Sequence, residues 1–367
     1  MRNKQFSYQF FSTTQNAWLG MFEAIKNAKR FVYWEVYMFF DDEQGKKFID
    51  LLCEKALAGV DVKLIIDGVG SMEFPRTAQE HLRAAGVEFL WYNPIFGPHF
   101  FSKLFQRLWE RNHRKVLVVD GSIGFVGGVN ISIYHRDWND LHLQVTGKAA
   151  RSLLYGFAKT YVKCGGDKKK MRHVFHPRLS GGFQTWRRRI SFIIHSPTYE
   201  SRRRLLRTYY KALDLAKESI TLLTPYYAPD ADFIRLLERA AARGVRIDLI
   251  MPARSDMEFM EIIAKKYFKQ MLKLGANIYL SKKMNHGKAV AVDGKFGVVG
   301  SINLTHRSFY DSEEAAAMFT DEKMVKELNQ ILMDWKNEAK PIGQVRQRGG
   351  IWNKIKAWVV TKFENYV

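Results

Sequence analysis

The chain has 367 residues, of which 47% are hydrophobic and 26% are charged. This profile excludes an intrinsically disordered protein and predicts a globular one with room for two domains. Lysine and arginine number 58 against 37 aspartate and glutamate, a formal net charge of +21. Such a charge predicts an anionic partner: a nucleic acid, an acidic membrane surface or a phosphorylated substrate.

The start of the chain and its two cysteines bear on the compartment. Residues 1–18 are too polar for a secretory signal peptide, and no stretch approaches the ~20 uninterrupted apolar residues of a membrane-spanning helix. Cys53 and Cys164 are too far apart for a disulfide framework or a spaced metal site, which favours a reducing compartment. We therefore expect a cytoplasmic protein that can still lie on a membrane surface.

The first regular elements alternate between strand and helix. An apolar strand is predicted over residues 31–40, followed by an amphipathic helix over 45–57 and a second strand. Gly59 lies where a helix C-cap is expected. This alternation is typical of α/β units on a mixed sheet.

Residues 100–109 form an aromatic stripe at helical spacing. One side of the predicted helix is apolar, and the other carries basic and polar residues. Such a helix can pack on the core, or its apolar face can contact a membrane. The membrane-contacting residues would be Phe100, Phe101, Phe105 and Trp109.

One motif occurs twice. Residues 112–130 have the sequence NHRKVLVVDGSIGFVGGVN, and residues 285–303 have the sequence NHGKAVAVDGKFGVVGSIN, an offset of 173 residues from His113 to His286. Each copy contains His-x-Lys-x4-Asp, followed by Gly-Gly or Gly-Ser and an asparagine. The polar members are His113, Lys115, Asp120 and Asn130, then His286, Lys288, Asp293 and Asn303.

This duplication sets the domain organisation. The second half repeats the strand at 220–227 and the helix at 232–243, with Gly244 at the C-cap position. We expect the α/β class, with two repeats on mixed sheets that pack with pseudo-two-fold symmetry around one active-site cleft. The predicted segments are repeat 1–165, a basic linker or crossover 166–200, repeat 201–345 and an amphipathic basic tail 346–367.

The motif has a physical logic. In a strand, residues i and i+2 face the same side, so each copy presents an imidazole and an ammonium together. A glycine pair before an amide suits a tight turn that brings N–H groups to an anion. Zinc does not fit, because each copy offers one histidine beside a lysine that repels cations. Two copies at matching places of a repeat lower the odds of a chance match to below about 1%.

With these features the sequence resembles the phospholipase D superfamily over nearly its whole length, and within it the bacterial cardiolipin synthases. Unlike many of those relatives, it shows no N-terminal membrane spans. It also has Asp-Ser-Glu-Glu at 311–314 where relatives usually have Leu-Asn-x-Glu, which leaves the acidic residue open between Glu313 and Glu314. The segments that carry the resemblance are Glu35-x-Tyr37, GVDVKLIIDGVGS, RNHRKVLVVDG, FVGGVNIS, DWNDLHLQVTG, TPYYAPD and GSINLTHRSF.

The resemblance implies a two-step reaction with a covalent phosphohistidine. His113 would attack the phosphodiester phosphorus, and His286 would protonate the leaving alcohol and then deprotonate the incoming one. Two lysines, Lys115 and Lys288, would neutralise the phosphate oxygens. No metal or other cofactor is expected, because the ammonium groups supply the positive charge. Further hydrogen bonds to the phosphate would come from Asn130 and Asn303.

A nucleophilic histidine needs an acceptor on its other nitrogen to fix its tautomer. The resemblance implies that this acceptor lies downstream of each motif. We accordingly expect Asp140 to orient His113 and Glu314 to orient His286.

The motif aspartates have two interpretations. As members of the His-Lys-Asp set, Asp120 and Asp293 are catalytic candidates. Each also precedes a glycine at a strand end, where an aspartate commonly holds a turn, and we favour this structural role.

The tail repeats the amphipathic pattern over residues 351–367. Trp352 and Trp358 lie on its apolar side, basic residues surround it, and Gly349-Gly350 precedes it. A packed terminal helix is one interpretation. An interfacial membrane anchor is the one we favour.

Three functions fit this sequence. The first is phosphatidyl transfer between anionic phospholipids, with phosphatidylglycerol as donor and acceptor, by an enzyme on the cytoplasmic side of the cell membrane. A nuclease or other phosphodiesterase of the same superfamily would also suit the charge, although the apolar helical stripes favour lipid, so no nucleic-acid partner is expected. The third is a membrane-binding scaffold, disfavoured because both motifs are intact. No obligate protein partner is evident.

Overall fold

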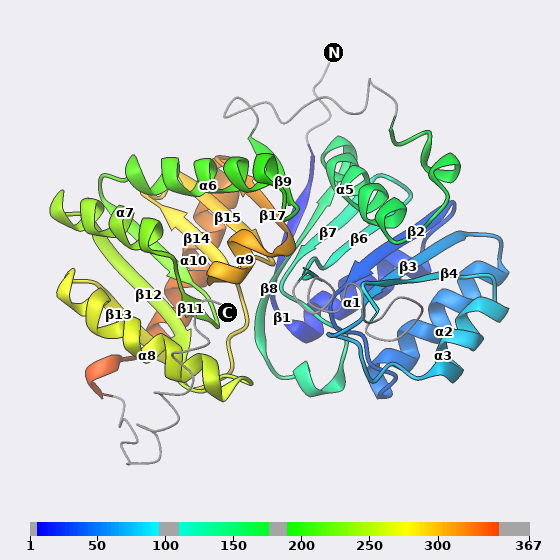
Figure 1. The fold of residues 1–367 in the computed structure, drawn as a ribbon, viewed down its shortest axis with the longest axis horizontal. Helices are drawn as coiled ribbons and strands as arrows, with labels where there is room; N and C mark the ends of the chain where they lie inside the picture. The colour runs from blue at the N-terminus through cyan, green and yellow to red at the C-terminus, as the bar shows by residue number, and fades with distance from the viewer. Residues whose placement is uncertain (1–5, 95–109, 176–188, 345–367) are drawn as a thin grey trace.

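The computed structural model describes residues 6–94, 110–175 and 189–344. Its elements form two halves that lie side by side, each with a mixed sheet and helices on both faces (Figure 1). The predicted α/β class with two mixed-sheet repeats is confirmed.

The first sheet combines parallel and antiparallel pairs. β2 pairs in parallel with β3, to which a helical crossover connects it, and antiparallel with β6. In order across the sheet, the strands are β1 (Tyr8–Thr13), β8 (Asn139–Thr146), β7 (Ile123–Gly127), β6 (Val116–Val119), β2 (Phe31–Val36), β3 (Asp61–Asp67) and β4 (Glu88–Tyr92).

The second sheet repeats this plan and takes in a strand from the first half of the chain. β5 (Arg111–Asn112) pairs in parallel with the start of β17, and a small separate sheet joins β11 (Tyr227–Ala228) to β16 (Leu304–Thr305). The other strands in order are β18 (Lys340–Pro341), β13 (Asn277–Ser281), β12 (Arg246–Pro252), β10 (Ser219–Leu223), β14 (Ala289–Val292), β15 (Phe296–Gly300) and β17 (Ser312–Phe319).

Local sequence sets the helix limits. In α2 (Glu43–Leu57), the Asp42 side chain accepts the N–H groups of Gln44 and Gly45 at the first turn. Past its end, Gly59 has φ +86°, the left-handed conformation that glycine adopts without strain, and Gly244 has φ +82° after α7. The other helices are α1 (Thr14–Lys26), α3 (Arg76–Ala84), α5 (Ala150–Lys163), α6 (Tyr199–Asp214), α7 (Ala231–Ala242), α8 (Glu258–Lys273), α9 (His306–Tyr310) and α10 (Glu322–Glu338).

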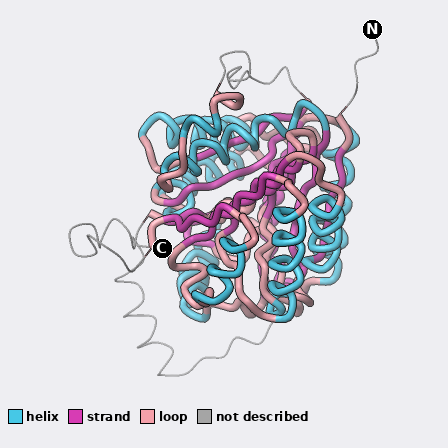
Figure 2. The backbone as a smooth tube through the Cα atoms, turned by 90° about the vertical axis from the view of Figure 1, so that its right-hand side faces the viewer, coloured by secondary structure: helices cyan, strands magenta, loops and turns pink. Residues whose placement is uncertain are grey.

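Both repeats contribute to one shared core. The helices α1, α2 and α3 cover one face of the first sheet, and α6, α7 and α8 cover one face of the second. The opposite faces, with α5 and α10, bury a single cluster in which Leu141 and Val126 of one repeat join Leu223 and Val299 of the other. From the side, strands run through the middle of the molecule between helices (Figure 2). A continuous core fixes the two repeats against each other.

One predicted segment needs correction. The basic linker was expected over 166–200, yet β9 (Ile190–His195) pairs antiparallel along β17 in the second sheet. Apolar side chains alternate along β9, and those of Ile190 and Phe192 are buried. The flanking runs of lysine, arginine and glycine obscured this six-residue strand in the sequence.

Two predicted membrane-contacting segments, 100–109 and 346–367, lie entirely outside the described residues. Within the described ranges, none of the helices has the length and hydropathy to cross a bilayer.

Candidate active site

The motif histidines lie where the repeats meet, just before β6 and β14. The backbone N–H of His113 donates to the carbonyl oxygen of Glu313 at 2.9 Å, and that of His286 donates to Asn139 at 2.7 Å. Each acceptor belongs to the opposite repeat. Backbone hydrogen bonds therefore hold each motif against its counterpart.

Each histidine also bonds a carboxylate from the opposite repeat. Nδ1 of His113 lies 3.0 and 3.2 Å from the two carboxylate oxygens of Glu314. Nδ1 of His286 lies 2.8 Å from Oδ2 of Asp140. The predicted pairing of Asp140 with His113 and of Glu314 with His286 is therefore wrong, and the partners are exchanged. The physical reason is that β8 and β17 run beside the other repeat's motif, so proximity in sequence does not give proximity in space.

The choice between the neighbouring glutamates is also settled. Successive strand residues point to opposite faces, and only Glu314 points to the histidine. Glu313 points away and forms a buried ion pair with Arg114 and a second ion pair, at 2.8 Å, with the partly exposed Lys163. It also accepts the hydroxyl of Ser196 at 2.7 Å.

The two orienting carboxylates differ in charge. Burial raises the pKa of Glu314 to about 7, against the opposing effects of Lys115 and of hydroxyl donors from Ser301 and Ser308. Burial would raise the pKa of Asp140, but the charge and hydrogen bond of His286, the charge of Lys288 and the N–H of Leu141 together lower it to about 2. Asp140 is therefore an anion at neutral pH, whereas Glu314 holds its proton part of the time.

The histidines differ in the same sense. Burial, then the charges of Lys115 and Lys288, hold the pKa of His113 well below its usual 6.5. Burial and Lys288 also lower the pKa of His286, but Asp140 opposes them. His113 is therefore neutral and suited to attack, while His286 accepts a proton more readily.

The two lysines are held by the backbone of their own motifs. Nζ of Lys115 donates to the carbonyl oxygen of His113 at 2.8 Å, and Nζ of Lys288 donates to that of His286 at 2.5 Å. Burial lowers the pKa of Lys288 to about 8. Burial and repulsion from Lys288 lower that of Lys115 well below its usual value. A bound anion would reverse both shifts.

The ends of the motifs differ by one residue. A Cβ on Gly128 would lie 2.1 Å from Oδ1 of Asp140, so the carboxylate needs glycine there. The second copy has Ser301 in this place, and its hydroxyl donates to Glu314. The asparagines that follow, Asn130 and Asn303, both line the cavity described next.

A cavity of about 380 Å³ opens in front of both histidines. Because Nδ1 of each is engaged by a carboxylate, Nε2 is the nitrogen left to face the cavity. Aromatic rings flank the histidines: Tyr37 lies 5.0 Å from His113, and Trp138 lies 5.5 Å from His286, between ring centroids. Further lining residues that the sequence did not single out are Arg111, Tyr226, Asp256 and Arg307. Arg111, Tyr226 and Arg307 lie in the segments that carry the family resemblance, whereas Asp256 lies outside those segments and had no sequence signal.

The motif aspartates lie elsewhere. Each carboxylate accepts three backbone N–H groups ahead of a central strand, at residues 29–31 for Asp120 and 217–219 for Asp293, over 2.7–3.0 Å. Both residues have φ 52°, as tight turns require. Neither lines the cavity. Their inclusion among the catalytic candidates is therefore corrected to the turn role, because the strand carries them away from the histidines.

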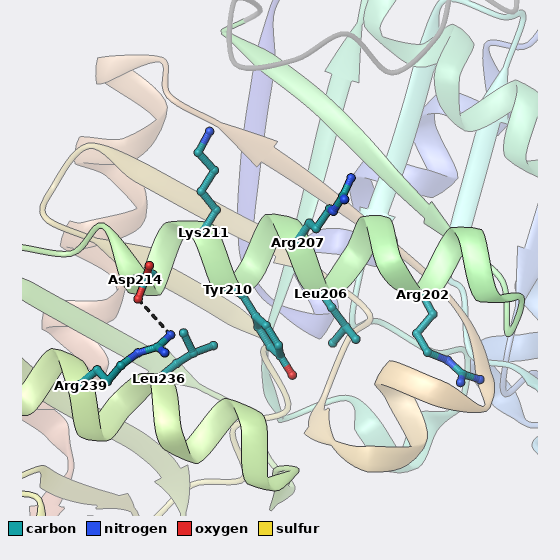
Figure 3. Close-up of a pocket in the computed structure, with 8 residues that line it drawn as sticks. All are labelled: Arg202, Leu206, Arg207, Tyr210, Lys211, Asp214, Leu236 and Arg239. Carbon is teal, nitrogen blue, oxygen red and sulfur yellow. Dashed lines mark hydrogen bonds and ion pairs between the residues drawn. The ribbon is translucent and has the colours of Figure 1, made fainter.

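A second hollow, of about 470 Å³, lies between α6 and α7 and shares no lining residue with the first. Its floor is apolar, from Leu206 and Leu236, and Arg207 projects from α6 beside it (Figure 3). Asp214 and Arg239 form an ion pair of 3.1 Å across it. The groove is basic, but it lacks the nucleophiles of the first cavity. Among the described residues, no group of three or more His, Cys, Asp or Glu could hold a metal ion.

Comparison with known proteins matches this geometry to a family. Residues 21–149 and 209–335, more than half of the chain, match the family described as "Cardiolipin synthase, PLD-like domain". Similar proteins include the cardiolipin synthase of Geobacillus thermodenitrificans, 31% identical over 90% of this chain and 66% of its own. Another is cardiolipin synthase 2 of Bacillus anthracis, 31% identical over 88% and 63%. The chain thus spans slightly under two thirds of the length of these relatives.

Solved structures share the fold. Phosphatidylserine synthase of Haemophilus influenzae Rd KW20 superposes with a TM-score of 0.73 at 14% identity, over 97% of this chain and 92% of that one. Polyphosphate kinase of Porphyromonas gingivalis gives 0.61 at 14% identity, over 100% of this chain and 54% of that one. At such identity the likeness concerns the fold alone. The two matched repeats, each with its His-Lys-Asp motif, show that the chain belongs to the phospholipase D superfamily, in the family with cardiolipin synthase-type domains.

Proposed function

We propose that the protein is a phosphatidyltransferase that forms cardiolipin from phosphatidylglycerol through a covalent phosphohistidine. The observation that carries the proposal is a single cavity that receives one histidine from each repeat, each bonded to a buried carboxylate. The names of the relatives support phospholipid chemistry.

In the first step, Nε2 of His113 attacks the phosphorus of the donor. A phosphorus–nitrogen bond forms, the bond to the glycerol oxygen breaks, and His286 donates its proton to that oxygen. The pKa of His113, held low by burial, keeps its lone pair available. Asp140 stabilises the charged form of His286 before transfer.

In the second step, His286 is neutral and takes the proton of an incoming hydroxyl. That oxygen attacks the phosphorus, the bond to His113 breaks, and His286 regains its proton. During both steps, charge grows on phosphate oxygens, where buried Lys115 and Lys288 would stabilise it without a metal ion. Asn130 and Asn303 line the same cavity and would add hydrogen bonds.

The location and partners are also proposals. We expect a peripheral enzyme on the cytoplasmic side of the cell membrane, bound to anionic phospholipids. The α6–α7 groove supports this, since Arg202 and Arg207 line it beside apolar side chains. Basic residues near an anionic leaflet contribute about 1 kcal/mol each.

The charge of +21 also suits a nuclease of the superfamily, and one experiment separates the candidates. The full chain is incubated with vesicles of labelled phosphatidylglycerol and, separately, with DNA. Labelled cardiolipin and free glycerol are expected from the vesicles, with neither product from a His113→Ala variant. Cleavage of DNA with no lipid product would favour a nuclease. No reaction with either substrate would favour a scaffold.

A further inference from the structure

One acidic side chain of the cavity has no part in the chemistry described above. Asp256 lies between β12 and α8, is exposed, and lines the cavity on the side of the second repeat. The hydroxyl of Tyr226 donates to its Oδ1 at 2.7 Å. The Tyr226 ring, itself 8% exposed, lies 6.2 Å from the ring of His286. A fixed tyrosine thus holds this carboxylate on the His286 side of the cavity.

Asp256 has no evident role in holding the local structure around it. The helix α8 begins after Met257 without a side-chain cap. The loop before it is held by Ser255, whose N–H donates to Glu261 at 2.7 Å. Oδ2 of Asp256 accepts no hydrogen bond from any residue in the described part of the chain, so it is available to a ligand.

The charge of Asp256 also needs a reason. The same cavity presents Arg111 and Arg307, as an anionic phosphodiester requires. A carboxylate here weakens anion binding unless it contacts a part of the substrate that donates hydrogen bonds. A hydroxyl is such a group, and its bond to a carboxylate is charge-assisted. An ammonium group fits less well, because the surrounding cations repel it.

We propose that Asp256, oriented by Tyr226, binds the second hydroxyl of a polyol headgroup such as glycerol, and so positions the reacting hydroxyl at Nε2 of His286. This inference rests on the proposed transfer and names its alcohol. The leaving alcohol of the first step and the attacking alcohol of the second both exchange a proton with His286. By microscopic reversibility they occupy one place, and a single subsite serves both.

The test is a competition between alcohols for one intermediate. The full chain receives a short-chain phosphatidyl-p-nitrophenol donor with glycerol and ethanol at equal concentrations, and the two transfer products are quantified. Their ratio does not depend on the amount of folded enzyme or on the rate of the first step. Since a hydrogen bond to a charged group is lost, Asp256→Asn should lower the glycerol-to-ethanol product ratio about tenfold or more. Tyr226→Phe should lower it less, because the carboxylate remains but loses its orienting donor.

A matched control removes the same charge from Glu73, an exposed residue of the first repeat that also lines the cavity. Glu73→Gln should keep the product ratio within about twofold, because an exposed charge acts weakly through water. The subsite is overturned if Asp256→Asn keeps the wild-type ratio, or if Glu73→Gln lowers it equally. It is also overturned if ethanolamine outcompetes glycerol in the wild type and loses that advantage in Asp256→Asn. If the wild type transfers to no alcohol, the proposed transferase function itself fails.

Discussion

The two halves of the active site have the same motif but different proton affinities. In one half, buried Glu314 with a pKa of about 7 orients His113. In the other, Asp140 with a pKa of about 2 orients His286. A duplicated scaffold thus supplies two histidines of matched geometry, while the exchanged carboxylates give them different electrostatic surroundings, which is the basis for proposing one as nucleophile and the other as acid.

The halves differ again behind the motif. Between the first histidine and lysine stands Arg114, 1% exposed, whose guanidinium bonds Glu313 and the hydroxyl of Thr160 at 2.7 Å. The second motif has Gly287 in that place. At this position the first motif places a buried charge at the repeat interface, and the second motif does not.

The largest effect is expected from substitutions that disrupt the two exchanged histidine–carboxylate pairs. Asp140→Asn and Glu314→Gln should each lower the rate of the first step about a hundredfold or more, because each replaces the carboxylate that orients its histidine with an uncharged amide that can also donate to Nδ1. With a p-nitrophenol donor, whose leaving group needs no acid, Asp140→Asn should recover most of its single-turnover rate and Glu314→Gln should not. The reverse recovery would support pairing within each repeat.

A stability comparison probes the ion network around Arg114. Arg114→Met should lower the free energy of unfolding by about 3–5 kcal/mol, because it removes the buried guanidinium that pairs with Glu313 and lies 3.9 Å from buried Glu35. Lys170→Met is the control, since its ion pair with Glu88 is exposed and should contribute less than about 1 kcal/mol. Urea unfolding measures both, and equal losses would contradict the assigned role of the network.

The same ion network predicts that the stability of the fold depends on pH. Burial alone would raise the pKa of Glu313, but Arg114 and Lys163 lower it to about 2 in the folded protein. A carboxylate with a lowered folded pKa stabilises the fold above its unfolded value, and this stability is lost as pH falls toward 2. The wild type should therefore lose more stability on acidification than Glu313→Gln.

A smaller effect concerns alkaline pH. Burial lowers the pKa of Lys288 to about 8, so its ammonium charge is lost as pH rises through that value. For the activated donor, which needs no acid, kcat/KM should fall about tenfold per pH unit above 8. In Lys288→Arg the guanidinium stays charged, so any residual activity should lack this decline. An unchanged alkaline decline would remove Lys288 as its cause.

The smallest effect concerns the turns. Asp120→Ala and Asp293→Ala should each cost about 1–3 kcal/mol of stability, equally in the two repeats, because each leaves backbone donors without their acceptor. Activity per folded molecule should be retained, since neither residue lines the cavity. Loss of kcat in a fully folded variant would restore a catalytic role.

Much of this site was predictable because the chain repeats itself. Matching copies identified the histidine–lysine pairs, and strand periodicity placed each pair on one face. The turn role of Asp120 and Asp293 followed from the glycine after each. Catalytic roles for these histidines and lysines remain predictions.

The rest depends on how the two halves pack, which no local pattern encodes. The exchange of Asp140 and Glu314 arises from β8 and β17 crossing to the other repeat's motif. Asp256 joins the cavity only when the loop after β12 meets Tyr226. The strand β9 was hidden because its six residues lie among basic and glycine-rich segments.

The central claim is that His113 carries the covalent intermediate while His286 moves protons. The most direct measurement traps the labelled phosphatidyl-enzyme from the p-nitrophenol donor after rapid quenching, and locates the label by peptide mapping. We predict label on His113 in the wild type, accumulation of that label in His286→Asn, and none in His113→Ala. Label on His286, or trapping by His113→Ala, would contradict the assignment of the two halves.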